Sequence, residues 1–259
     1  MRFPLSIALI ALSLLPIHGW TQPAAAARSW PLLVILDPGH GGSNNGAIGK
    51  HTRAYEKQLS LKIAQLVAAK LARRRQLRVV LTRQSDRYLT LAARTRLANS
   101  LLKRSRAARA LFLSIHLNAS PSRSQRGFEV YVLAKQASGQ NAARLALREN
   151  DGKVAAPLSD SAPQQILNQL RQSGHRMASI QLARELRRAL RDARGADADR
   201  GLMSAPFDVL LGLQMPAALV ELGFIDHLRE GAELTSTAVQ EALAGALAKG
   251  IARYAKLGD

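Results

Sequence analysis

Two histidines and two glutamates carry side chains that can bind a metal ion or transfer a proton. They are His40, Glu56, His116 and Glu221. Two histidines and a carboxylate are a common ligand set for catalytic zinc, which keeps a fourth position for water. Zinc lowers the pKa of that water toward about 7, and a carboxylate that does not bind the metal accepts the proton. Glu221 fits this second role, so the set predicts hydrolysis of an amide or ester.

Each of these residues also has a purely structural explanation. A buried histidine is more often a hydrogen-bonded core residue than a ligand. A glutamate at the start of a helix, such as Glu56, is stabilised there by the helix dipole. Glu221 fits a structural carboxylate equally well. The metal site is favoured by placement, because His40, His116 and Glu221 each follow an apolar run in the sequence.

The elements predicted around these residues bring them to one edge of a sheet. Strand-like runs cover 32–36, 77–82, 110–115, 127–133 and 217–220, and helical spacing covers 56–74, 89–102, 177–193 and 239–254. This alternation predicts an α/β fold, a mostly parallel or mixed twisted sheet with helices on both faces, in a single domain. The carboxyl ends of the strands form the edge where ligands bind in open α/β sheets.

The stretch from Val34 to Gly49, VILDPGHGGSNNGAIG, surrounds His40 with glycines and small polar residues. Two interpretations are open. The glycines either turn the chain, with His40 capping the turn, or keep the loop bare so that His40 can bind another molecule. The second interpretation predicts open space beside His40 for a substrate.

The chain is strongly basic and contains no cysteine. Its 259 residues include 37 Lys and Arg against 18 Asp and Glu, a net charge of +19, which favours an anionic partner. Aromatic residues make up only 4% of the chain and are not interleaved with the basic ones, which argues against nucleic acid. A polyanion of the cell envelope is the better match. Without cysteine, His, Asp and Glu are the available metal ligands.

Residues 1–27 have the layout of a cleavable secretory signal peptide. A positive start is followed by an apolar run from Pro4 to Ile17 and by a small-residue stretch that ends at Ala27. The apolar run is short for a membrane anchor, so we expect export without stable membrane insertion. Residues 28–259 then form the catalytic domain, in which a polar segment at about 135–174 is predicted to be an insertion.

Six stretches together resemble one known family. ILDPGHGGSNNGAIG, YEKQLSLKIA, VVLTRQSDRYLTLAARTRLAN, LFLSIHLNAS, GFEVYVL and PAALVELGFI follow the order found in the zinc-dependent N-acetylmuramoyl-L-alanine amidases of amidase type 3. The resemblance implies that His40, Glu56 and His116 bind one Zn²⁺ and that Glu221 is the catalytic glutamate. It also implies the bond that is cut, the amide between the lactyl group of N-acetylmuramic acid and L-alanine in peptidoglycan.

The resemblance reaches the division-associated members from Gram-negative bacteria, which implies a periplasmic enzyme of cell-wall remodelling and daughter-cell separation. In those members an inserted helix covers the zinc, and its glutamate can occupy the open ligand position. AARLALREN resembles the start of that helix and makes Glu149 the autoinhibitory candidate, released by an envelope activator protein. The family continues with residues like ASDLIGG, whereas this chain reads DGKVAAPLSD. The alternative for Glu149 is an exposed helix charge.

Other expectations follow from the same resemblance. Asn118 matches an HxN pattern after His116, and we expect it to contact substrate or to shape the loop. Arg83 and Arg94 also match positions of the family pattern. A role in salt bridges is sufficient to explain both residues. We expect a monomer. Two other functions stay open, a zinc peptidase acting on the peptidoglycan stem peptide and a non-catalytic wall-binding or regulatory protein. The presence of all four key residues argues against the second.

Overall fold

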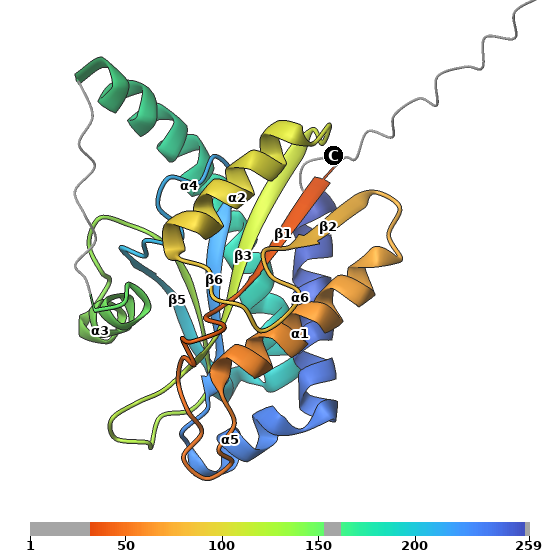
Figure 1. The fold of residues 1–259 in the computed structure, drawn as a ribbon, viewed down its shortest axis with the longest axis vertical. Coiled ribbons are helices and arrows are strands. Elements are labelled where there is room, and N and C mark those ends of the chain that lie inside the picture. Colours follow the sequence, from red (N-terminus) through yellow and green to blue (C-terminus); the bar gives the residue numbers. More distant parts are fainter. Residues whose placement is uncertain (1–31, 153–161, 257–259) are drawn as a thin grey trace, which may run out of the picture.

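A six-stranded mixed sheet forms the centre of the molecule (Figure 1). The computed structural model describes residues 32–152 and 162–256, with side chains described outside 162–174, so the predicted signal peptide lies outside this range. The strands are β1 (Leu32–Pro38), β2 (Leu77–Leu81), β3 (Arg109–Asn118), β4 (Phe128–Leu133), β5 (Asp199–Ala205) and β6 (Ala217–Phe224). Their order across the sheet is β2-β1-β3-β6-β4-β5.

Four strands run in one direction and two run in the other. β1 pairs in parallel with β2 and β3, and β3 pairs in parallel with β6. β4 is antiparallel to β6 and parallel to β5. The predicted α/β class with a mostly parallel or mixed sheet is therefore confirmed.

Helices cover both faces of the sheet. They are α1 (Glu56–Ala72), α2 (Leu91–Arg104), α3 (Gln140–Glu149), α4 (Ala162–Arg194), α5 (Leu228–Thr235) and α6 (Thr237–Lys256). Figure 1 shows α2 crossing in front of the sheet, with α4 and α6 behind it. Among the described residues, no helix is long and apolar enough to cross a membrane.

The alternation of side chains along β1 explains its continuous apolar run. Leu32, Val34 and Leu36 pack in the core formed with α1, α4 and α6, whereas Leu33 and Ile35 pack in the core formed with α2 and α3. A strand covered on both faces needs apolar residues at every position. The run ends at Asp37, where the chain reaches the edge of the sheet.

Three elements differ from the sequence-based expectation. β5 and α5 were not predicted, because β5 (DRGLMSA) is a partly buried edge strand with few β-branched residues and α5 spans only 8 residues. α4 begins at Ala162, inside the segment predicted to be an insertion, and not near residue 177. Its first turns are polar but rich in Gln and Leu, which form helices without an apolar stripe.

Candidate metal centre

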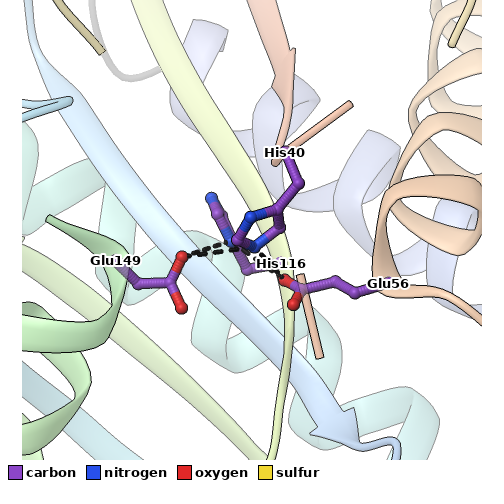
Figure 2. Close-up of side chains that lie close together, drawn as sticks. All are labelled: His40, Glu56, His116 and Glu149. Atoms are coloured by element: carbon purple, nitrogen blue, oxygen red, sulfur yellow. Dashed lines mark hydrogen bonds and ion pairs between the residues drawn. The ribbon is translucent and has the colours of Figure 1, made fainter. Parts of the chain in front are cut away.

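Four side chains from four separate elements meet at the carboxyl edge of the sheet (Figure 2). His40 lies in the loop after β1, Glu56 is the first residue of α1, His116 lies near the end of β3, and Glu149 is the last residue of α3. One nitrogen or oxygen atom from each lies within 4.8 Å of those of the others. Glu56, His116 and Glu149 are buried and His40 is nearly so. The structure therefore brings together the three predicted ligands and the predicted blocking residue.

Glu56 is held as an ionised carboxylate. One oxygen accepts a hydrogen bond from the Ala47 backbone N–H at 2.7 Å, and the other accepts one from Leu117 at 3.0 Å. The second oxygen also lies 3.0 Å from His116 Nδ1 and 3.1 Å from His40 Nε2. Burial favours the neutral acid, but the His40 charge and the His116 hydrogen bond outweigh it and hold the pKa of Glu56 well below its usual range.

His40 is oriented by a contact on the far side of its ring. Its Nδ1 lies 3.1 Å from Asn44 Oδ1, which also accepts from the Gly46 backbone N–H. Because that oxygen acts as an acceptor, Nδ1 carries the proton and Nε2 faces the centre. The backbone of His40 has φ of +57°, a conformation rarely adopted by residues other than glycine, and Arg94 bonds its carbonyl oxygen.

The chemistry of this group fits a divalent cation. In the described part of the chain, the buried His40 Nε2 and Glu149 Oε2 have no hydrogen-bond partner. Burial lowers the pKa of both histidines, yet the Glu56 and Glu149 charges raise it to about 11 for His40 and about 9 for His116. Two carboxylates thus attract positive charge strongly at this point. Two imidazole nitrogens and carboxylate oxygens are ligands that Zn²⁺ accepts.

The glycines around His40 make room for protein atoms and not for open space. A Cβ atom at Gly39 would lie 2.4 Å from His116 Cε1, and one at Gly46 would lie 2.5 Å from both Glu56 Oε2 and His40 Cδ2. A Cβ atom at Gly41 would lie 2.2 Å from the Arg87 carbonyl oxygen. The interpretation that the loop is bare for a bound substrate is wrong at these positions, because predicted ligands fill the space beside Gly39 and Gly46 and a backbone oxygen fills the space beside Gly41.

A buried network around Asp37 fixes the loop that carries His40. The Asp37 carboxylate accepts from Thr82 Oγ1, from Ser114 Oγ at 2.9 Å and from Arg94 Nη1 at 2.8 Å. Arg94 also donates to the Pro38 carbonyl oxygen at 2.7 Å. The predicted salt bridge of Arg94 is present, and its further bonds position the loop. Sequence reasoning did not identify Asp37, although an aspartate that ends an apolar run is a signal.

Arg83 supports the same loop in a different way. It is almost fully buried and donates to the carbonyl oxygens of Pro38 at 3.0 Å, Gly39 at 2.6 Å and Lys57 at 2.8 Å. These carbonyls belong to the His40 loop and to the first turn of α1, so Arg83 ties His40 to Glu56. A salt bridge alone was predicted for this residue, whereas its main partners are backbone oxygens.

Glu221 lies beside the four-residue group on the next strand. It pairs with His116 in the register of β3 and β6 and is fully buried. Both carboxylate oxygens are without a hydrogen-bond partner in the described chain, and the nearest cation is Arg148, whose Nη2 lies 3.7 Å from Oε1. Burial, followed by the Glu149 charge, raises the pKa of Glu221 well above its usual range, and Arg148 opposes this. A raised pKa is suited to proton transfer.

Asn118 is engaged by protein groups. Its Nδ2 donates to Glu129 Oε2 at 2.9 Å, and its Oδ1 accepts from Arg148 Nη2 at 3.2 Å. Glu129 also accepts from Tyr131 and, at 2.6 Å, from Arg200 Nε. Of the two expected roles, these contacts favour shaping the loop, and a substrate contact stays a prediction. Sequence reasoning did not identify Glu129, which faces Glu221 across the β4–β6 pair.

Comparisons with known proteins identify the family of this chain. The family described as N-acetylmuramoyl-L-alanine amidase (Amidase_3) matches residues 34–253. AmiC of Escherichia coli O6:H1 is 28% identical over 249 residues, and the match covers 92% of this chain and 56% of AmiC. AmiA of Escherichia coli K12 is 31% identical over 243 residues, covering 92% of this chain and 81% of AmiA. The chain thus spans little more than half of AmiC.

A solved structure shares the fold. The amidase AmiC2 of Nostoc punctiforme superposes with a TM-score of 0.66 at 27% identity, over 88% of this chain and 99% of that one. The family match spans the loop of His40, both ends of α1 and the strands that carry His116 and Glu221. This chain therefore belongs to the N-acetylmuramoyl-L-alanine amidase type 3 family.

Proposed function

We propose that the protein is a zinc-dependent amidase that cuts the bond between N-acetylmuramic acid and L-alanine in peptidoglycan. The observation that carries this proposal is the convergence of His40, Glu56 and His116 at one buried point, with Glu221 on the adjacent strand. Membership of the family and the similarity to proteins named N-acetylmuramoyl-L-alanine amidase support the choice of bond. We assign the site residues the roles set out below.

His40, Glu56 and His116 would hold the zinc, which when bound polarises the scissile carbonyl and makes water a nucleophile at neutral pH. The backbone N–H groups of Ala47 and Leu117 keep Glu56 ionised and oriented. Glu221 accepts a proton from the attacking water and returns it to the leaving amine of L-alanine. Its burial and raised pKa support this role, because a carboxyl group with a raised pKa can take up a proton and give it back.

We further propose that α3 holds the enzyme inactive through Glu149. Its Oε2 lies 3.0 Å from His116 Nδ1 and 3.4 Å from His40 Nε2, so it would take a ligand position that the substrate and water need. α3 ends at this residue, since the Gly152 N–H bonds back to the Leu147 carbonyl oxygen and Asp151 has φ of +54°. The exposed-charge alternative does not fit a side chain that is only 2% exposed.

Arg148 supports the same inactive arrangement. Its Nε donates to Glu149 at 3.0 Å, its Nη1 donates to the Ala119 carbonyl oxygen at 2.9 Å, and its Nη2 reaches Asn118. The same Nη2 lies 3.7 Å from Glu221. One side chain of α3 therefore approaches the catalytic glutamate while its neighbour approaches the ligands. Displacing α3 would release both at once.

Because α3 blocks the site in this arrangement, activation requires that α3 be displaced. We propose that an envelope protein does this. α3 buries a narrow face, formed by Ala142, Leu145 and Ala146, and leaves Leu147 46% exposed. So small an apolar face adds little to the stability of the docked helix, and an activator would mainly have to replace the contacts of Arg148 and Glu149. The proposed setting is the periplasm, where residues 1–27 direct the chain and where peptidoglycan is remodelled during division.

Digestion of purified peptidoglycan tests the bond, the metal and the catalytic residue together. We would compare the exported chain, a Glu149→Ala variant, and the Glu149→Ala variant carrying Glu221→Ala or Glu241→Ala, each with zinc and with a chelator. Glu241 is a partly exposed glutamate of α6, and its replacement is the matched control. Mass spectrometry should find free stem peptides that begin at L-alanine. Chelator or Glu221→Ala should abolish them, and Glu241→Ala should not.

Other products would contradict the proposal in different ways. Shortened peptides still attached to glycan would identify a zinc peptidase. No product from any form, including Glu149→Ala with zinc, would favour the wall-binding or regulatory function.

A further inference from the structure

The end of the molecule opposite the metal centre is strongly cationic. Three segments meet there, 73–81, 99–111 and 245–256, and they contain eleven Lys and Arg residues and no Asp or Glu. The pairing of Leu32 with Leu77 and with Arg109 places the starts of β1, β2 and β3 at this end, on the upper right of the sheet in Figure 1. The Arg109 side chain bonds the Ala255 carbonyl oxygen, which brings the end of α6 to the same place.

A groove lies at this end between α1 and α6. Its volume is about 360 Å³. The floor is formed by small residues of α6, Gly245, Ala248 and Ala252, and the walls carry five cations, Lys70, Arg74, Lys249, Arg253 and Lys256. A floor of this kind accepts apolar or glycerol-like groups, and the walls attract anions.

Carboxylates offset only part of this charge. Lys70 pairs with Glu241 at 2.6 Å, and Lys249 and Arg253 share Asp192 at 3.2 Å and 3.3 Å. Within the described part of the chain, Arg74 and Lys256 have no ion pair shorter than 4 Å, and both are exposed. The groove therefore keeps a net positive charge.

The helix dipoles do not account for all of these residues. α1, α2 and α6 end here, and basic side chains in a last turn, such as Lys103 and Arg104, ordinarily complement the partial negative charge of a helix end. Arg75, Arg78 and Arg106 lie beyond the helix ends and are exposed. Repulsion among these positive charges destabilises the protein. An anionic partner that covers the whole end would offset this repulsion.

We propose that this cationic end docks on a bilayer surface rich in anionic phospholipid, with headgroups entering the groove. Charge complementarity supports a lipid surface, because the cations come from three segments spread over one end and do not converge on a single ligand. Each Lys or Arg near such a surface adds to the attraction. No lipid needs to enter the active site, so this docking is independent of the amidase activity proposed above.

Docking in this orientation leaves the metal centre facing away from the bilayer. α1 runs from Glu56 in the centre to the wall of the groove and is about 25 Å long at 1.5 Å per residue. A bilayer at this end would therefore hold the enzyme with its catalytic edge toward the wall.

Flotation with lipid vesicles tests the proposal without using activity. The exported chain would be mixed with vesicles of equal parts phosphatidylglycerol and phosphatidylcholine, or of phosphatidylcholine alone. The test variant carries Arg74→Glu, Arg106→Glu and Lys256→Glu. The matched control carries Arg123→Glu, Arg126→Glu and Arg229→Glu, exposed positions outside this end, with the same change in net charge.

The wild type and the control should float with the phosphatidylglycerol vesicles, and high salt should release them. The test variant should bind on the order of 100-fold more weakly. Circular dichroism would verify that the variants are folded. Failure of the wild type to float, or equal weakening in both variants, would overturn the proposal. Sedimentation with purified peptidoglycan that depends on these three residues, without flotation, would overturn it in favour of a carboxylate polymer.

Discussion

His116 Nδ1 lies 3.0 Å from a carboxylate oxygen of Glu56 and also 3.0 Å from one of Glu149. The two carboxylates come from different elements, since Glu56 begins α1 and Glu149 ends α3. Glu56 is fixed by two backbone N–H groups, whereas the contacts given for the Glu149 oxygen that faces the histidines are ion pairs with His40 and His116. The Glu56 carboxylate is therefore fixed by the backbone around the site, whereas the position of the Glu149 carboxylate depends on the short helix α3.

Replacing Glu149 should activate the enzyme. With Glu149→Ala, amidase activity on purified peptidoglycan is expected to rise by about tenfold or more. In most wild-type molecules the Glu149 carboxylate fills the ligand position, and alanine leaves that position open. Arg144→Ala, an exposed residue of the same helix, is the control and should change little. Unchanged activity in a Glu149→Ala protein that still binds zinc would contradict autoinhibition.

Gly39→Ala should disturb metal binding while the fold persists. The new Cβ would lie 2.4 Å from His116 Cε1, so the ring must move. We expect zinc affinity to fall by about 10–100-fold, measured by competition with a chromophoric chelator. Gly245→Ala meets no atom within 4 Å and lies inside α6, so it should leave affinity unchanged and stabilise the helix by about 0.5–1 kcal/mol. Equal zinc affinity in both variants would refute the proposed packing.

Zinc binding should release protons. The pKa of His40 is raised to about 11 and that of His116 to about 9. Both side chains are therefore in the charged imidazolium form at pH 7 in the metal-free protein. Ligands must lose these protons, and we expect the release of about two per zinc at pH 7. Calorimetric titrations in buffers of different ionisation enthalpy measure the number. Release near zero would mean that the histidines are neutral before binding.

The same shifts predict how the stability of the metal-free protein depends on pH. A raised histidine pKa stabilises the fold fully below the unfolded value of 6.5. This contribution is lost as the pH rises through about 9 and about 11.

Arg94→Ala should strongly destabilise the protein. The substitution leaves Asp37 buried without its ionic partner and frees the carbonyl oxygens of Pro38 and His40. The expected loss is about 3–5 kcal/mol of unfolding free energy, measured by urea denaturation. Arg94→Lys should not rescue it, since a lysine cannot make these divergent bonds. The control is Arg96→Ala, exposed on the same helix, with an expected change within about 0.5 kcal/mol. Similar losses in both variants would show that the Asp37 network is not the cause.

Glu221→Gln should stabilise the metal-free protein at neutral pH. Because the folded protein raises the pKa of Glu221 well above 4.5, it binds more protons than the unfolded chain between these values, and stability falls as the pH rises. Glutamine removes this cost, so we expect a gain in stability at pH 7 that vanishes as the pH falls toward 4.5. Thermal melts over this pH range measure it. A gain that persists at pH 4.5 would point to packing and not to titration.

The sequence by itself determined the class of fold and the central residues of the site. Strand-like and helical periodicities are local, and they located eight of the main elements to within a few residues, with the exception of the start of α4. His40, His116 and Glu221 follow strands, and Glu56 begins a helix, so their convergence followed from the shared edge of a parallel sheet. The resemblance to a known family then supplied the expected role of each of these residues.

Only the tertiary structure decided which distant groups hold those residues in place. Asp37 and Arg94 are 57 positions apart, and Glu129 faces Glu221 only because β4 runs antiparallel to β6. The glycine loop could not be interpreted from sequence, since the atoms that fill the space beside Gly39 come from β3. Local patterns carry no information on such pairings. Strand order and the packing of side chains between elements set them, and these depend on the free energy of the whole fold.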